Sequence, residues 1–309
     1  MRAGNLSLLY ENGSIRYISA GKSEIIRMIY FAVRDNEWIT IPPAIWDEVI
    51  EQLDDSFTIR YNCRFKSDKI DFEASCKIAG NSGNSLTLQV KGKAIRTFEK
   101  NRIGFCVLHP IEGTAGQPCT IINTRGSSDF NFFPCYISPH QLFTDIKSMQ
   151  WDNGVIKCRL DFTGDAFETE DQRNWTDASY KTYSTPLGKP FPVTLSKGED
   201  LFQKVTFQAG KVPDFHYEAN DIINIIIPPG EMLELPAVGI SRSTRPEPLT
   251  DNEISILKTL RFDHYRVDVH LHSDTWKEAA EAAINEAKKL GYALELALFF
   301  GDEPTRQCH

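Results

Sequence analysis

The sequence lacks the features of several large protein classes. No apolar run approaches the roughly 20 residues that a membrane-spanning helix needs, and the N-terminus has no continuous apolar core with a secretory cleavage pattern. Basic residues are not in excess, because 34 Lys and Arg stand against 42 Asp and Glu, a net charge of −8. These absences argue against a membrane protein and against binding to nucleic acid or an anionic membrane. We therefore expect a cytoplasmic protein.

Motifs of nucleotide and esterase chemistry are also missing. The chain has no glycine-rich phosphate loop and no Gly-x-Ser-x-Gly turn, which argues against a nucleotide enzyme and a serine esterase of the α/β-hydrolase type. Its seven cysteines are widely spaced and include no Cys-x-x-Cys pair. We expect reduced thiols that mostly fill the core. The sequence predicts no cofactor and assigns no metal.

The first 235 residues have the pattern of strands and turns. Apolar and polar residues alternate in runs such as FTIRYNCRF (57–65) and SLTLQVKGKAI (85–95), which is typical of strands with one covered face. Asn12-Gly13 between two apolar runs predicts a hairpin, whereas AIWDEVIEQL (44–53) fits either a helix or a strand. We predict that the protein is mainly β and that residues 1–235 form an antiparallel β-sandwich.

From residue 236 onward, strand and helix patterns alternate. LTDNEISILKTL (249–260) opens with a capping box, and the Ala-rich run 273–292 ends in two lysines and a glycine, so both predict helices. Strand-like runs lie at 264–271 and 293–300, and LPAVGIS (235–241) is a short apolar run before the first helix. This β-α-β-α-β order begins a β/α (TIM-type) barrel, which needs eight strands and about 250 residues. We predict that residues 236–309 are the N-terminal part of such a barrel, truncated after the third strand.

Two blocks are long and unusual in composition, NRIGFCVLHP (101–110) and EDQRNWTDASYKTY (170–183). Together with GQPCTI (116–121) and GKPFPVTL (188–195), they resemble the D-apionate lactonase family of bacterial sugar-acid catabolism. The resemblance runs from about residue 20 to the end of the chain. It implies hydrolysis of a sugar-acid lactone, D-apionolactone to D-apionate, and an N-terminal β domain before a β/α barrel. A member that ends after three barrel strands is expected to be inactive alone.

The second block offers the residue types that bind sugars. Carboxylates and amides pair with hydroxyl groups, an aromatic face covers C–H surface, and a cation holds a carboxylate or a lactone carbonyl oxygen. Under this hypothesis Trp175 is mostly buried, and Asp171, Arg173 and Asp177 form a network that faces a concave surface. The competing interpretations are a surface loop in which Arg173 pairs with a neighbouring carboxylate, and a contact that fixes domain orientation. The candidate substrate-binding residues here are Asp171, Arg173, Asn174, Trp175, Asp177 and Lys181.

His109 is a further candidate, because a histidine can activate water for attack on an ester carbonyl. The alternative is a strand-end histidine bonded to the backbone. YRVDVHLH (265–272) carries polar residues at alternate positions, which places them on one strand face. Two imidazoles and a carboxylate there could ligate Zn²⁺, but a metal would need more ligands; the alternative is a buried Arg266–Asp268 network.

Active sites of β/α barrels gather at the C-terminal ends of the strands. The catalytic candidates chosen on this ground are His270, His272, Asp302 and Glu303, and Arg266 is a substrate-binding candidate. The predicted partner is a small sugar-acid lactone. The edge strand 293–300, without barrel partners, is a predicted surface for self-association.

Two other functions fit the same sequence. A glycoside hydrolase would need two carboxylates at a defined separation. A non-catalytic carbohydrate-binding or scaffolding β domain would need only the binding residues.

Overall fold

The computed structural model describes residues 1–154, 156–212, 234–243 and 247–301. The chain forms two compact units, Met1–Asp221 and Ile222–His309. No helix among the described residues is long and apolar enough to cross a membrane.

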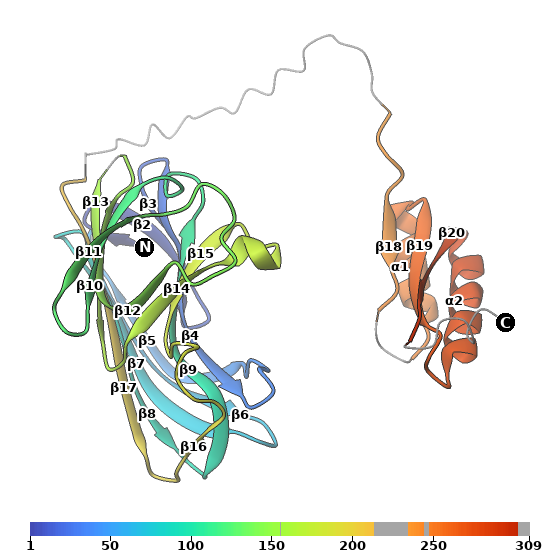
Figure 1. Cartoon of the computed structure of the whole chain (residues 1–309), viewed down its shortest axis with the longest axis horizontal. Coiled ribbons are helices and arrows are strands. Elements are labelled where there is room, and N and C mark those ends of the chain that lie inside the picture. Colours follow the sequence, from blue (N-terminus) through green and yellow to red (C-terminus); the bar gives the residue numbers. More distant parts are fainter. Residues whose placement is uncertain (155, 213–233, 244–246, 302–309) are drawn as a thin grey trace. The chain divides into compact units, whose positions relative to one another are not determined.

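The first unit is one antiparallel sheet of 17 strands, drawn from blue to yellow in Figure 1. It includes one short 3₁₀ helix, η1 (Gln172–Trp175). The strands are β1 (Arg2–Ala3), β2 (Leu6–Glu11), β3 (Ser14–Ala20), β4 (Ser23–Asp35), β5 (Pro43–Gln52), β6 (Phe57–Lys66), β7 (Asp71–Asn81), β8 (Ser85–Ala94), β9 (Phe98–Pro110), β10 (Pro118–Asn123), β11 (Ser128–Phe132), β12 (Phe143–Asp152), β13 (Lys157–Thr163), β14 (Phe167–Asp171), β15 (Ser179–Tyr183), β16 (Val193–Leu195) and β17 (Asp200–Ala209).

Strand pairing follows a continuous path. It runs from β5 through β6, β7, β8, β17 and β13 to β12, and then through β14, β15, β9, β4, β3 and β2 to β1. β10 extends from β12, and β16 from β9. The sheet curls on itself around one hydrophobic core, so that Phe31 of β4 meets Phe65 and Phe72 with ring centroids 6.0 and 6.5 Å apart. The antiparallel β prediction is confirmed, and the strands form one curled sheet rather than two separate ones.

Local sequence accounts for the strand boundaries. Asn12 and Gly13 both have positive φ, 46° and 78°, as a two-residue hairpin turn between β2 and β3 requires. The ambiguous run 44–53 is strand β5, which pairs with β6 and carries a bulge between Trp46 and Val49. The described cysteines are free thiols, and all but Cys135 are buried, as expected.

The second unit contains a three-stranded parallel sheet in the order β18 (Gly239–Ser241), β19 (His264–His270) and β20 (Ala293–Phe299). The strands are joined by α1 (Asp251–Leu260) and α2 (Trp276–Leu290). Thr250 and Glu253 form the expected capping box. Tyr265, Val267 and Val269 pack against apolar residues of both helices, so the helices cover one face of this sheet. The expected parallel order is confirmed, while the TIM-type barrel remains a prediction.

Candidate functional site

The candidate site lies on the sheet face opposite the core. Successive side chains of a strand point to opposite faces. On β9, Ile103, Phe105 and Val107 therefore enter the core, whereas Arg102 and Cys106 emerge on the other side. Side chains of β4, β14 and β15 also alternate between the core and the pocket face. Loop residues and η1 cover this second face and enclose a pocket.

The pocket has a volume of about 490 Å³, within the usual range for small-molecule sites. Three cations and one carboxylate line it, together with two tryptophans and a tyrosine. The lining residues are Ala32, Arg34, Trp38, Arg102, Cys106, Glu170, Gln172, Trp175, Lys181, Tyr183, Ser184 and Leu187.

Arg102 is the most unusual residue of the pocket, because its side chain is only 4% exposed. Its guanidinium carbon lies 5.4 Å from the ring centroid of Trp38 and 4.6 Å from that of Phe191. Nη1 donates a hydrogen bond to the carbonyl oxygen of Asn101 (2.6 Å). Nε and Nη2 are buried and have no hydrogen-bond partner among the described residues. Burial lowers the pKa of Arg102 below its ordinary value.

A hydrogen-bonded group on β14, η1 and β15, next to β9 in the sheet, also lines the pocket. The Lys181 ammonium donates to Glu170 Oε1 (3.1 Å), and Gln172 Nε2 donates to the same oxygen (2.7 Å). Tyr183 donates its hydroxyl proton to Glu168 (2.6 Å), a buried carboxylate behind the pocket. Burial and this hydrogen bond raise the pKa of Tyr183, so the phenol is neutral at physiological pH. These contacts fix Glu170 and Lys181 at the surface of the pocket.

Cys106 offers no nucleophile. It is buried beside Ala32 and Tyr183, and burial raises the pKa of its thiol. The thiolate is the reactive form, and the raised pKa keeps the thiol protonated. Cys106 therefore forms part of the apolar floor of the pocket. The pocket thus combines aromatic faces, cations and one carboxylate, which suits a polar ligand with anionic character.

The prediction for Trp175 is wrong, because its side chain is 73% exposed. η1 projects from the end of β14 as the yellow-green turn in Figure 1, with none of its residues buried. Phe133 and Tyr180 already fill the core at this point. The indole of Trp175 instead lines the rim of the pocket, and so the residue remains a substrate-binding candidate for a different reason.

Asp171, Arg173 and Asn174 have a structural role rather than the predicted one. Arg173 Nε and Nη2 donate to the Asp171 carboxylate (2.9 and 2.7 Å). Arg173 also donates to three backbone carbonyls of residues 134–136. Asn174 donates to the carbonyl of Ser138. Their polar groups are used to hold this loop, which favours the surface-loop interpretation for these three residues.

Asp177 accepts a hydrogen bond from the Ser179 hydroxyl (3.0 Å) and does not line the pocket. The expected network of Asp171, Arg173 and Asp177 around a concave surface is therefore not formed. Lys181 lines the pocket and stays a substrate-binding candidate.

The two blocks singled out in the sequence meet in this region, because β15 pairs with β9 from Ser179–Pro110 to Tyr183–Cys106. The sequence profile of the D-apionate lactonase N-terminal domain matches residues 1–212.

The chain belongs to the D-apionate lactonase family.

A relative in this family is the D-apionate lactonase of Brucella anthropi. It is 38% identical over 209 residues, which cover 66% of this chain and 34% of the relative. The chain thus matches about a third of that enzyme's length.

Two solved structures show weaker likeness. The Slr1438 protein of Synechocystis sp. PCC 6803 is 12% identical with a TM-score of 0.44, over 66% of this chain and 91% of that one. A GalM/aldose epimerase homologue from C. elegans is 6% identical with a TM-score of 0.33, over 67% and 100%. Likeness at this level carries no argument about the site.

The structure corrects the hypothesis that His109 binds the substrate or activates water. The side chain is fully buried in the core, where Nε2 lies 2.9 Å from Thr182 Oγ1. Burial lowers its pKa to about 3. His109 shares its strand face with Ile103, Phe105 and Val107, so it cannot contact a ligand in the pocket or act there as a general base.

In the second unit, alternation along β19 puts Arg266, Asp268 and His270 on one face, as predicted, and that face is exposed. Arg266 lies 3.3 Å from Asp268 and 3.5 Å from Glu295, on the surface rather than in a buried network. The rings of His270 and His272 are 5.5 Å apart. Asp302 and Glu303 lie outside the described residues. Within the described ranges, no group of three or more His, Cys, Asp or Glu side chains is placed to hold a metal.

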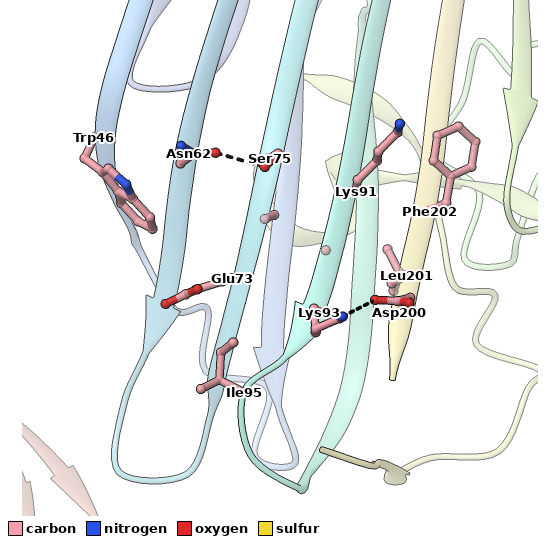
Figure 2. Close-up of a pocket in the computed structure, with 12 residues that line it drawn as sticks. Trp46, Asn62, Glu73, Ser75, Lys91, Lys93, Ile95, Asp200, Leu201 and Phe202 are labelled. Carbon is pink, nitrogen blue, oxygen red and sulfur yellow. Dashed lines mark hydrogen bonds and ion pairs between the residues drawn. The ribbon is translucent and has the colours of Figure 1, made fainter. Parts of the chain in front are cut away.

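A second groove lies on the first unit, along β5–β8 and β17 (Figure 2). It is larger, about 790 Å³, and more open. Its ion pair, Lys93–Asp200 (3.4 Å), has side chains that are 57% and 77% exposed. Ion pairs exposed to this degree contribute little free energy. We therefore place the candidate site at the Arg102 pocket. Sequence reasoning missed Arg34, Arg102, Glu170 and Tyr183, because the faces of their strands could not be assigned, and it missed Trp38, which lies in the turn after β4.

Proposed function

We propose that this protein takes part in the hydrolysis of a sugar-acid lactone, D-apionolactone to D-apionate, and that the Arg102 pocket binds the sugar. The observation that carries the binding proposal is a pocket of sugar-acid size that is lined by two tryptophans, a tyrosine, three cations and one carboxylate. Membership of the family and the name of the Brucella anthropi relative support the reaction.

The reaction itself sets simple demands. Water adds to the lactone carbonyl to give a tetrahedral oxyanion, the ring C–O bond breaks, and the leaving oxygen takes a proton. A base must accept the proton of water, and cations or hydrogen-bond donors must stabilise the oxyanion. We propose His270, His272, Asp302 and Glu303 as the groups that activate water, and Arg266 as a substrate-binding residue. In this proposal residues 236–309 are the start of a β/α barrel, residues 1–235 are the sugar-binding β domain, and the protein is cytoplasmic.

The first test is binding of D-apionolactone to the whole chain, measured by calorimetry. Trp175→Ala should weaken binding on the order of tenfold, since an aromatic contact of this kind contributes roughly 1 kcal/mol or more. Trp46→Ala is the matched control, because it removes an exposed tryptophan of the open groove. Equal effects of the two substitutions would place the sugar elsewhere.

The second test is acid release from D-apionolactone at constant pH, with and without a His270→Ala, His272→Ala double substitution. Activity that the double substitution abolishes supports the proposed catalytic residues and contradicts the expectation that this chain is inactive alone. Lactone binding without any acid release agrees with that expectation and with the non-catalytic carbohydrate-binding alternative. The glycoside hydrolase alternative fits the pocket poorly, because Glu170 is the one carboxylate among its lining residues.

A further inference from the structure

Three arginines of this protein use the same edge of the guanidinium to bind a carboxylate. Arg64 uses Nε and Nη2 to bind both carboxylate oxygens of Asp71 (2.7 and 2.8 Å). Arg173 binds Asp171 in the same way. Arg159 and Asp161 form a third such pair, with distances of 2.7 and 2.6 Å. The Nε–Nη2 edge is therefore the edge on which this protein holds carboxylates, with the two parallel bonds that suit that group.

Arg102 presents the same edge without a carboxylate. Nε and Nη2 are its two unpartnered nitrogens among the described residues, and both are buried. Glu168 and Asp165 lie near enough to favour the charged form of Arg102. However, Glu168 accepts from Tyr183 and Leu187, and Asp165 accepts from Thr185 and the Lys189 ammonium. Buried donors of a cation that lack hydrogen-bond acceptors are unfavourable, so a ligand that supplies acceptors for Nε and Nη2 gains affinity.

The charges around the pocket act in the same direction. Lys181 is paired with Glu170, which leaves the guanidinium groups of Arg34 and Arg102 as the excess charge of the lining. A neutral lactone has no group that compensates two positive charges. The ring-opened sugar acid carries a carboxylate that compensates one of them.

We infer that the pocket recognises the ring-opened sugar acid rather than the lactone, and that Arg102 holds its carboxylate through Nε and Nη2. This inference rests on the proposed function, because it names the ligand class of the same pocket. The rings of Trp38 and Phe191 cover the guanidinium, so one of them moves aside when the carboxylate binds. Both rings are partly exposed, 39% and 46%, and lie outside the strands, where such a movement leaves the sheet intact.

The inference is tested by calorimetry of the whole chain with D-apionate and D-apionolactone, at equal ionic strength and within the lifetime of the lactone. The acid should bind at least about tenfold more tightly. Arg102→Gln should remove that preference and leave lactone affinity within about threefold. Arg102→Lys should restore it only in part, because an ammonium cannot form two parallel bonds. Arg60→Gln is the control, since Arg60 forms an exposed pair with Glu51.

Three results separate the inference from the proposed function. Equal affinities for acid and lactone, or an unchanged acid affinity in a folded Arg102→Gln protein, would overturn the inference and leave lactone binding intact. If neither compound binds, the proposed sugar site fails and the inference fails with it. Thermal unfolding of each variant confirms that it is folded, and Arg102→Gln should not lower the melting temperature, because it removes a buried charge.

Discussion

His109 should make the protein lose stability in mild acid. Its imidazole is fully buried between Trp151 and Phe133, with ring centroids 5.3 and 5.7 Å away. Nε2 lies next to Thr182 Oγ1, and Nδ1 has no hydrogen-bond partner in the described part of the chain. Burial therefore holds the pKa of His109 at about 3, whereas an unfolded histidine has a pKa of about 6.5.

The sign and size of the effect follow from these two pKa values. Below pH 6.5 the His109 imidazole binds a proton in the unfolded chain but stays neutral in the native protein. The stability that is present above pH 6.5 is therefore lost as the pH falls toward 3. At pH 5.0 the loss from this one group is about 2 kcal/mol. Any native pKa below about 4 gives the same figure.

The assay is urea unfolding at pH 7.5 and 5.0, followed by tryptophan fluorescence, for the natural protein and His109→Gln. Groups common to both proteins cancel in the comparison. The free energy of unfolding of the variant should therefore fall by about 2 kcal/mol less between the two pH values. His140→Gln, which removes an exposed histidine, is the control. An identical pH dependence in His109→Gln and the natural protein would refute the reasoning.

Two further substitutions test the contacts that support the site. Asp171→Asn should destabilise the first unit by about 3 kcal/mol, because it leaves Arg173 without its buried carboxylate; an unchanged melting temperature would show that other contacts hold residues 134–138. Glu286→Gln should weaken the second unit, where this carboxylate accepts from Arg242 and Tyr265 at 2.8 and 3.0 Å. Limited proteolysis should then cut the second unit earlier while the first survives, and equally early loss of both would contradict two independent units.

Local patterns were sufficient for much of the fold. Alternating residues identified β6 and β8, Asn12-Gly13 the first hairpin, and Thr250 with Glu253 the start of α1. Each depends on neighbours in the sequence, whose effects are short-ranged. The continuous curl of the sheet depends on which distant strands pair, such as β4 with β9, and sequence alone did not determine that.

The site was less predictable for a specific reason. Nearly every residue from Asn101 to Pro110 is buried, because one face of β9 meets the core and the other meets the pocket floor. A strand buried on both faces shows no alternation in its sequence, so the sequence did not reveal that His109 faces the core, and Arg102 was overlooked. The prediction for Trp175 failed for another reason, since the composition of 170–183 does not reveal that η1 lies outside the core, where the Trp175 indole lines the pocket rim.

The two-sided burial of β9 also bears on how a family of this kind can change its ligand. Substitutions at positions such as 102 and 106 alter the pocket, while those at 103, 105 and 107 alter the core. Specificity can therefore diverge by point substitution at alternate positions with little loss of folding stability. Insertion of a single residue would exchange the two sets and place a guanidinium in the core. The length of this strand should thus be more strictly constrained in evolution than the identity of its pocket-facing residues.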